Sequence, residues 1–398
     1  GNSAEGPIMA ALQSNSLKLR VEALYLMRNL KTTNAVESLV GPMLSEASTE
    51  LQQEVAARSL EKITGRVPDR RECQDRLYRS SRQYLMDQIV VSGSPGDMVK
   101  WWLWDAEQRI MKPIWLNAQT LARIRAFQRA RDLVALNSDN REYRRLYWLT
   151  RLETAKMTGG VQHRLPQPVL QTLASSIGTE MAEDVLDQAL QMNRIPAAVA
   201  ACEVMGAIAD KSYLVSQHGT TSPLTRALTA GSMRLTAAAA DAIYKIDPAR
   251  SFSGSSDYVS ALVYMASSSG SKSAIVGHVD REIAQSLAAL TSRRGYAARP
   301  ATSARELFEQ AQNDPDVELL VVTDKLARPG FSELVQAIRT NPRTRHLPIL
   351  LMVDPDNISR AQRLADRYAN IQVSPAVASE LVIARQIDNL VEAIDYED

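Results

Sequence analysis

The stretch Val317-Glu318-Leu319-Leu320-Val321-Val322-Thr323-Asp324 is a short, largely apolar run that ends in a carboxylate. Its aliphatic and β-branched residues are typical of a buried strand. Similar runs lie on both sides of it in the chain, each followed by a helical pattern, at 274–279, 297–300, 347–353 and 371–373. Five strands that alternate with five helices within about 120 residues predict a doubly wound parallel sheet over residues 273–396.

Three local features accompany this pattern: Gly295-Tyr296 after the first helix, Leu347-Pro348-Ile349-Leu350 at the fourth strand, and Ser374-Pro375 after the fifth. With them, the α/β segment resembles a response-regulator receiver domain, which has a flavodoxin-like fold. The resemblance implies a phospho-acceptor aspartate after the third strand and an acidic pair for Mg²⁺ after the first. It also implies a hydroxyl residue after the fourth strand and a lysine after the fifth.

The acidic positions of the family are only partly filled in this chain. The acidic pair falls on His278 and Val279, and Asp280 comes one position too late, although a one-residue slip would bring it near the pocket. The acceptor position is Asp324. One carboxylate is a poor ligand set for a hard cation, which needs several oxygens.

The residues that would hold the phosphoryl oxygens are replaced. The hydroxyl position is Val353, the lysine position is Ser374, and the aromatic switch position is Ile371. Phosphoryl transfer depends on positioning and charge neutralisation. We therefore interpret residues 273–396 as a pseudo-receiver without metal or cofactor, whose surface at 357–396 corresponds to the family's partner or dimer face. A phospho-regulated switch through Asp324 stays open as the alternative.

Helical repeats precede this segment. Apolar residues at helical spacing run from Leu19 to Leu30 and return from Leu51 to Ile63. Ala23 to Ala56 and Leu30 to Ile63 are both shifts of 33 residues, with a second amphipathic stretch at 35–44 between them. Such a period predicts helix–turn–helix units that stack as a solenoid.

Later units are rich in alanine, which lets stacked helices approach closely. They lie at 197–208, 223–230 and 235–246, and the last one ends in Ile246-Asp247-Pro248. These units resemble HEAT repeats. The chain is therefore predicted to be a multidomain protein, with an all-α HEAT-like solenoid at 8–266, a Ser/Gly linker at 267–272 and the receiver-like domain at 273–396.

A tryptophan-rich segment interrupts the helical pattern. Aromatic and β-branched residues on both sides of a polar connection predict a β-hairpin at about 98–117. Trp101, Trp102 and Trp104 must point to both faces of the first strand. One face would anchor the hairpin to the solenoid, and the other would meet a protein partner; an anchor role for all of them is the alternative.

Arginines cluster on the next predicted helix, 121–136. Arg125 and Arg129 share one helix face, which suggests a ridge that binds acidic or phosphate groups. The alternative is a solvated face, because acidic residues such as Asp132 and Asp139 are interleaved. A nucleic-acid-binding solenoid that uses this ridge is kept as a rival function.

Composition excludes several other classes. The 398 residues carry a formal net charge of +1, with 45% hydrophobic and 23% charged residues, so a general attraction to nucleic acid is not expected. Two cysteines cannot form a disulfide framework, and no apolar run reaches the length of a bilayer span. No histidine has metal-ligand spacing, and no acid, base or nucleophile constellation is visible. An enzyme is therefore not expected.

We expect a scaffold or adaptor for protein partners in signalling or assembly, with a homodimer through the receiver-like domain as a further expectation. The combination is similar to large bacterial signalling proteins, an analogy of architecture alone. A cytoplasmic location is expected. An exported protein stays open, because the chain begins Gly1-Asn2-Ser3 without a methionine.

Overall fold

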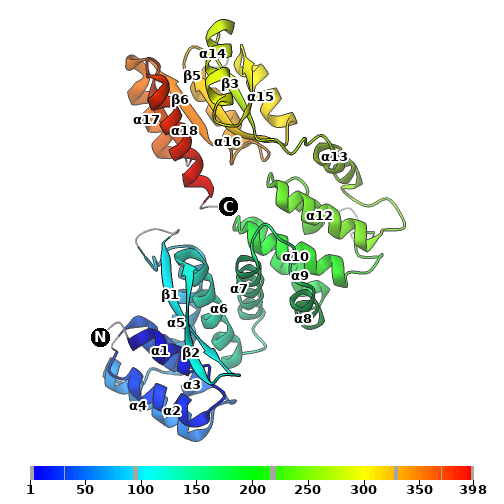
Figure 1. Cartoon of the computed structure of the whole chain (residues 1–398). Coiled ribbons are helices and arrows are strands. Elements are labelled where there is room, and N and C mark those ends of the chain that lie inside the picture. The colour runs from blue at the N-terminus through cyan, green and yellow to red at the C-terminus, as the bar shows by residue number, and fades with distance from the viewer. Residues whose placement is uncertain are drawn as a thin grey trace. The chain divides into compact units, whose positions relative to one another are not determined.

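The computed structural model describes residues 4–30, 32–92, 97–215, 221–326, 330–368 and 370–395 (Figure 1). The chain divides into two compact units, residues 1–201 and 202–398. Each unit is described by itself.

The first unit consists of helices and one β-hairpin. The elements are α1 (Glu5–Ala11), α2 (Leu17–Met27), α3 (Thr33–Leu44), α4 (Glu50–Thr64), α5 (Arg70–Leu85), β1 (Met98–Asp105), β2 (Ile110–Asn117), α6 (Ala118–Leu136), α7 (Arg141–Gly159), α8 (Gln167–Ile177), α9 (Thr179–Gln191) and the start of α10 (Ile195–Ile208). Neighbouring helices pack on one another, among them α3 on α4, α5 on α6, and α6 on α7. This pairing is what a HEAT-like solenoid requires, but the contacts establish no repeat of fixed length, so the solenoid stays a prediction.

Side-chain caps fix where several helices begin. The Thr49 hydroxyl accepts from the Gln52 N–H while the Gln52 side chain accepts from the Thr49 N–H, and Asp69 and Glu72 form the same capping box on α5. Each box satisfies backbone donors that the first turn leaves unpaired. Helix α5 was missing from the sequence-based expectation, because its 16 residues carry charged side chains at close intervals along their length.

The predicted hairpin is present with the expected bounds. β1 and β2 pair antiparallel from Met98 opposite Asn117 to Asp105 opposite Ile110. The Asp105 carboxylate accepts the N–H groups of the connecting turn and pairs with Lys112 at 2.6 Å. The turn therefore organises the strands without needing a partner.

The second unit contains α11 (Pro223–Ala227), α12 (Met233–Ile246), α13 (Ser255–Ala266) and an α/β domain. Its five parallel strands are β3 (Ser273–Gly277), β4 (Ala297–Ala301), β5 (Val317–Thr323), β6 (Ile349–Val353) and β7 (Ile371–Pro375), in the order β4-β3-β5-β6-β7. The connections are α14 (Arg281–Ser292), α15 (Ala304–Asn313), α16 (Phe331–Thr340) and α17 (Ile358–Arg367), with α18 (Glu380–Asp395) after β7.

Both faces of the sheet are covered by helices (Figure 1). One core packs α15, α16 and α17 against the sheet through residues such as Leu307, Leu334 and Ile338. The other core contains Ala288 of α14 and Ile387 of α18. Burial on both faces explains why β3, β5 and β6 are nearly continuous apolar runs. A doubly wound parallel sheet is therefore confirmed.

The Ser/Gly stretch that was predicted as a linker is held in place. The hydroxyls of Ser268 and Ser269 and the Ser269 N–H donate to the Asp316 carboxylate, at 2.5 to 2.7 Å. The division into two compact units falls at 201/202, and α11–α13 belong to the same unit as the sheet. The linker at 267–272 stays a prediction. The predicted limits of the solenoid at 266 and of the receiver-like domain at 273 and 396 stay predictions, and residue 396 lies outside the described residues.

Candidate functional site

The candidate site lies at the carboxyl ends of the neighbouring strands β3 and β5. Gly277 pairs with Val322, and the Thr323 hydroxyl donates to the Gly277 carbonyl at 2.8 Å. His278 and Asp324 directly follow these strands. The sheet thus places at its carboxyl edge the positions where a doubly wound fold binds ligands.

Asp324 is held from one side. Its Oδ2 accepts the Asp354 N–H at 2.9 Å and the Asn357 Nδ2 at 2.7 Å. Its Oδ1 is buried and has no hydrogen-bond partner among the described residues. The β6–α17 connection therefore closes on the carboxylate, an arrangement that sequence reasoning missed. The donors come from 30 and 33 residues further along the chain.

Lys325 supplies a cation next to Asp324, but it points to another acid. Its Nζ forms an ion pair with the Asp354 carboxylate. The hydrogen bond and the charge of Asp354 raise the pKa of Lys325, with a smaller contribution from Asp324. The ion pair thereby balances the negative charge of Asp354.

Asp280 does not compensate for the missing acidic pair. Its Oδ1 accepts from the N–H groups of Glu282 at 2.8 Å and Ile283 at 3.3 Å, as the N-cap of α14. His278 Nδ1 accepts the Asp280 N–H at 2.8 Å. The one-residue slip that would bring Asp280 toward the pocket is therefore absent, because its carboxylate is used to begin a helix.

Val353 and Ser374, the two positions that the resemblance assigns to contacts with a phosphoryl group, are both buried. Val353 is fully buried in the apolar core. Ser374 is also fully buried, and its hydroxyl donates to the Pro375 carbonyl at 3.4 Å. No group of three histidine, cysteine or carboxylate side chains arranged for a metal ion exists in the described part of the chain.

The hairpin tryptophans predicted as partner-binding residues are mostly turned inward. Trp101 is 8% exposed, and Trp102 lies against Gly6 of α1, where an added Cβ would come within 2.5 Å of its ring. Trp104 has a buried Nε1–H without a hydrogen-bond partner among the described residues. Trp115 is 62% exposed. The anchor role therefore fits Trp101 and Trp102, and the exposed aromatic ring belongs to the second strand.

The arginine ridge needs a correction. Arg129 is 2% exposed, with Nε 2.8 Å from Glu37 Oε2 and Nη1 donating to the Ser38 hydroxyl. Arg125 is half-buried, with its guanidinium 5.8 Å from the centroid of the Tyr84 ring. Arg129 is thus held in an internal ion pair and cannot bind a partner's phosphate or carboxylate.

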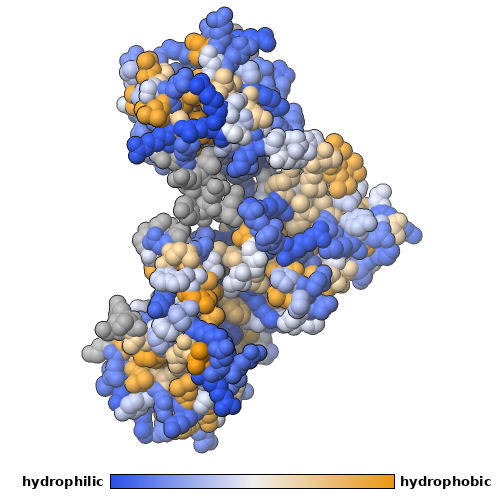
Figure 2. Space-filling view, in the orientation of Figure 1, coloured by the Kyte–Doolittle hydropathy of each residue, from blue (hydrophilic) through white to orange (hydrophobic). Residues whose placement is uncertain are grey.

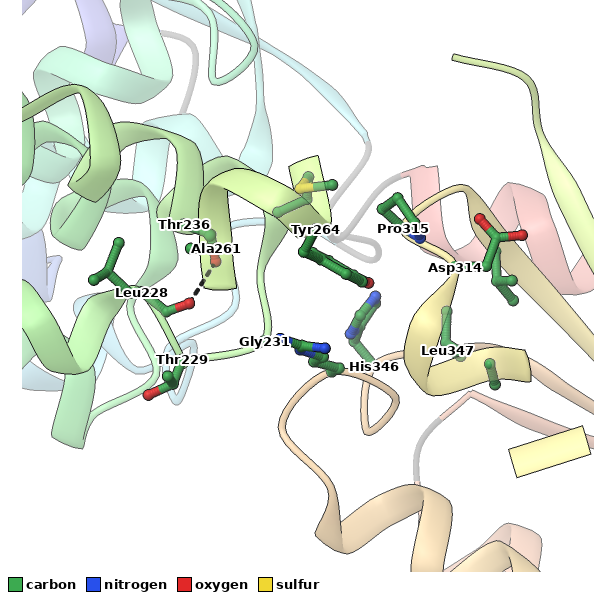
Figure 3. Close-up of a pocket in the computed structure, with 14 residues that line it drawn as sticks. Leu228, Thr229, Gly231, Thr236, Ala261, Tyr264, Asp314, Pro315, His346 and Leu347 are labelled. Carbon is green, nitrogen blue, oxygen red and sulfur yellow. Dashed lines mark hydrogen bonds between the residues drawn. The ribbon is translucent and has the colours of Figure 1, made fainter. Parts of the chain in front are cut away.

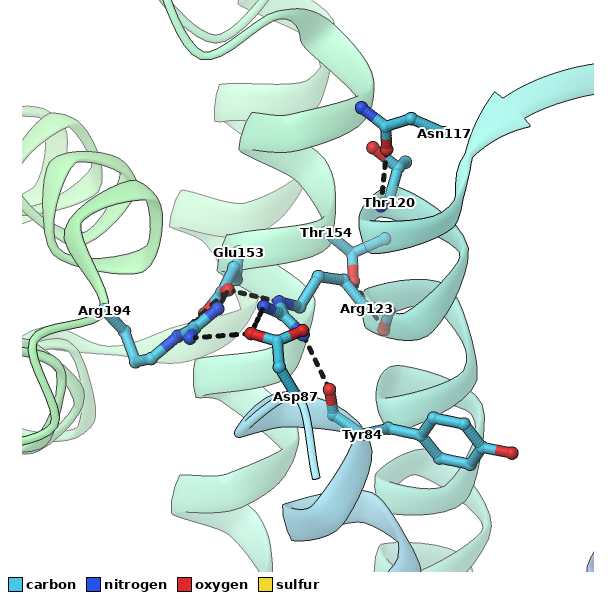
Figure 4. A network of polar contacts seen from close by, with 8 residues as sticks. All are labelled: Tyr84, Asp87, Asn117, Thr120, Arg123, Glu153, Thr154 and Arg194. Atoms are coloured by element: carbon cyan, nitrogen blue, oxygen red, sulfur yellow. Dashed lines mark hydrogen bonds and ion pairs between the residues drawn. The ribbon is translucent and has the colours of Figure 1, made fainter. Parts of the chain in front are cut away.

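A second buried ion cluster was not predicted at all (Figure 4). Arg123 is fully buried and donates to Glu153 Oε1 at 2.8 Å, Asp87 Oδ1 at 2.8 Å and the Tyr84 carbonyl at 2.6 Å. Arg194 donates to the same Glu153 carboxylate at 3.1 Å. Burial alone lowers the pKa of Arg194, but the hydrogen bond and charge of Glu153 raise it. The cluster joins α6, α7 and the segments before β1 and α10.

The second unit encloses a narrow cavity of about 40 Å³ between α11–α13 and the α/β domain (Figure 3). Tyr264 and Leu228 line one side, and His346 and Leu347 line the other. The Arg343 guanidinium lies 4.3 Å from the centroid of the Tyr264 ring. A cavity of this volume holds little more than a water molecule, so this is a packed junction and not a substrate site.

The thiols of Cys73 and Cys202 are both free and buried. Burial raises the pKa of the Cys73 thiol to about 11 and raises that of Cys202 as well. A raised pKa disfavours the thiolate, which is the nucleophilic form of cysteine. Across the described residues, no helix combines the length and apolarity needed to span a membrane.

The strand order, with the second strand beside the first and the first beside the third, defines a flavodoxin-type α/β domain accompanied by helical pairs. By sequence, the chain matches no protein-family model and no curated protein.

Three solved structures of signalling proteins align with about a third of the chain. A response regulator receiver domain protein from Clostridium thermocellum shares 13% identity over 32% of this chain and 98% of its own, with a TM-score of 0.29. A sensor protein from Polaromonas shares 22% identity over 30% and 98%, with a TM-score of 0.26. The receiver domain of a histidine kinase from Syntrophus aciditrophicus shares 16% over 31% and 92%, also at 0.26. At these TM-scores the likenesses carry no weight, and the fold class rests on the strand order.

Proposed function

We propose that this chain is a non-catalytic protein-binding scaffold in signalling or assembly, whose receiver-like domain does not take up a phosphoryl group. The observation that carries the proposal is the closed environment of Asp324. Backbone and amide donors from Asp354 and Asn357 occupy one carboxylate oxygen. The acidic-pair positions are His278 and Val279, and Lys325 is paired with Asp354. A Mg²⁺ ion would find one available carboxylate instead of several oxygen ligands.

Exposed apolar side chains support a binding role. On α13, Val259, Leu262 and Val263 are 59%, 41% and 65% exposed, and Tyr244 of α12 is 74% exposed. Figure 2 shows apolar side chains gathered over α13. The last helices of a stacked array normally have a polar outer face. The exposed apolar side chains of α13 therefore indicate an interaction site, because contiguous apolar surface is typical of such sites.

The proposal is tested by titrating the chain with Mg²⁺ in a calorimeter. We expect no binding in the millimolar range, because Asp324 lacks acidic neighbours. The matched control restores the family's acidic pair with His278→Asp and Val279→Asp, and this double variant should gain Mg²⁺ affinity. Mg²⁺ binding by the wild type that disappears in Asp324→Ala would contradict the proposal.

A phospho-regulated switch is the second candidate, and one observation favours it. The buried Oδ1 of Asp324 has no hydrogen-bond partner among the described residues, and an oxygen without a donor is where an incoming group would attach. The nucleic-acid alternative has no comparable support, because Arg123 and Arg129 are used in internal ion pairs.

A further inference from the structure

A groove in the first unit lies between α6, α7 and α8, and we name it the α8 groove. Its walls include Phe127 of α6, Arg151 and Ala155 of α7, and Pro168, Val169 and Leu173 of α8. It offers about 380 Å³, which falls within the range of ligand pockets. Apart from Arg151 and two threonines, its lining is apolar.

Arg151 gives the α8 groove its charge. Its guanidinium lies 4.8 Å from the centroid of the Trp148 ring and 5.7 Å from that of Tyr147, and Nη1 donates to the Tyr147 hydroxyl at 2.9 Å. No carboxylate of the described residues pairs with it. Stacking and the tyrosine hold the planar group in place, while most of its five N–H donors stay available.

The dimensions limit what fits. From Pro168 to Leu173, helix α8 rises by about 7.5 Å at 1.5 Å per residue, the space of one or two side chains. Val169 is 37% exposed at the groove, so an occupant enters from the surface. The combination of a short apolar recess and a fixed cation is complementary to a large apolar side chain next to a carboxylate.

We infer that the α8 groove binds a segment of a partner protein in which an aromatic side chain adjoins a glutamate or aspartate. The aromatic ring fills the recess beside Phe127 and Leu173, and the carboxylate pairs with Arg151. Large anchor side chains in pockets of this kind carry most of the affinity of an interface. The inference rests on the proposed scaffold function and specifies the chemistry of its partner.

The test uses two capped dipeptides, acetyl-Phe-Glu-amide and acetyl-Phe-Gln-amide, with binding to the full chain measured by saturation-transfer NMR. The glutamate probe should bind on the order of tenfold more tightly than the glutamine probe, because a charged bidentate contact replaces a neutral one. Arg151→Gln should abolish this difference. Arg144→Gln, on the exposed side of the same helix, is the matched control and should preserve it.

A second variant provides an independent test in case Arg151→Gln does not fold. Val169→Trp fills the α8 groove from its exposed rim and should weaken both probes about equally. Equal affinity of the two probes for the wild type, no binding of either, or unchanged binding by Val169→Trp would overturn the inference. Binding of dodecanoate without binding of the peptides would also overturn it, in favour of a lipid ligand. The Mg²⁺ titration tests the α/β domain, whereas the dipeptides test the α8 groove. A negative result for the groove can therefore be distinguished from a negative result for the proposed function.

Discussion

Arg123 and Arg129 lie on the same helix as Arg131, whose side chain is 43% exposed, and the local sequence does not distinguish the three. The difference comes from distant partners, since Glu153 is 30 residues from Arg123 and Glu37 is 92 residues from Arg129. A buried guanidinium is tolerated only where a carboxylate and further acceptors replace water. Helical periodicity contains no information on such pairings, so the arginine ridge was predicted where two ion pairs exist.

Removal of one partner from the buried cluster should be costly. Glu153→Ala removes the fully buried carboxylate that Arg123 and Arg194 share and leaves only the half-exposed Asp87 to balance both guanidinium groups. It should lower the free energy of unfolding by about 3–5 kcal/mol. Glu54→Ala, which breaks the exposed pair with Arg58, should cost less than about 1 kcal/mol. Urea unfolding followed by circular dichroism measures both, and similar losses in the two variants would show that the cluster does not stabilise the fold.

The hairpin tryptophans should differ in the same way. Trp101→Ala removes a ring that is 8% exposed and should destabilise the chain by about 3–5 kcal/mol. Trp115→Ala removes a ring that is 62% exposed and should change stability little. Thermal unfolding compares the variants. A larger loss of stability in Trp115→Ala would show that the second strand, and not the first, anchors the hairpin.

At the scale of elements, periodic patterns predicted most helices, the hairpin and all five strands. The alternation of apolar runs with helices contains this information locally. Helix α5 was not predicted, because charged side chains surround the few apolar residues of its buried face, which includes Cys73 and Leu77. The hydrogen bond from Asn357 to Asp324 was not predicted either, because it depends on how two loops pack in the folded chain.

The junction of α11–α13 with the α/β domain depends on Gly231. Its φ is +94°, and a Cβ there would lie 1.6 Å from the Pro342 carbonyl oxygen. Gly295 has a similar φ of +89° with nothing within 4 Å of its Cβ position. Gly295→Ala should cost about 1–2 kcal/mol from backbone strain alone, and Gly231→Ala should cost clearly more. Differential scanning calorimetry compares them, and equal melting temperatures would mean that the close contact is not formed.

The Ser/Gly stretch should loosen in acid. Partial burial raises the pKa of Asp316, but hydrogen bonds from Ser268 and Ser269 outweigh it and hold the pKa below its usual value. A lowered folded pKa means that the stabilisation is complete above the unfolded value of about 3.9 and is lost as pH falls through the folded value. The Ser269 amide chemical shift should therefore move only below about pH 4. Asp316→Asn should remove this step, and a step that persists in the variant would exclude Asp316 as its origin.

At the scale of the whole chain, the doubly wound sheet could be predicted because five strand–helix units follow one another without interruption. The compact units 1–201 and 202–398 could not be predicted from local composition, because they follow from contacts between distant elements. The linker at 267–272 stays a prediction. Asp316 binds this stretch, and α13 packs beside the sheet domain through Tyr264 and Arg343. Composition reports the freedom of a segment in isolation, whereas its order depends on partners elsewhere in the fold.

We propose that the receiver-like domain keeps its fold without phosphoryl chemistry. The most direct measurement is the intact mass of the chain after incubation with acetyl phosphate and Mg²⁺, for the wild type and for Asp324→Ala. The account predicts no phosphoryl mass gain in either protein, because Asp324 lacks an acidic pair and its adjacent cation is paired with Asp354. A gain that is stable in acid, labile in base and absent from Asp324→Ala would contradict it and establish a phospho-regulated switch.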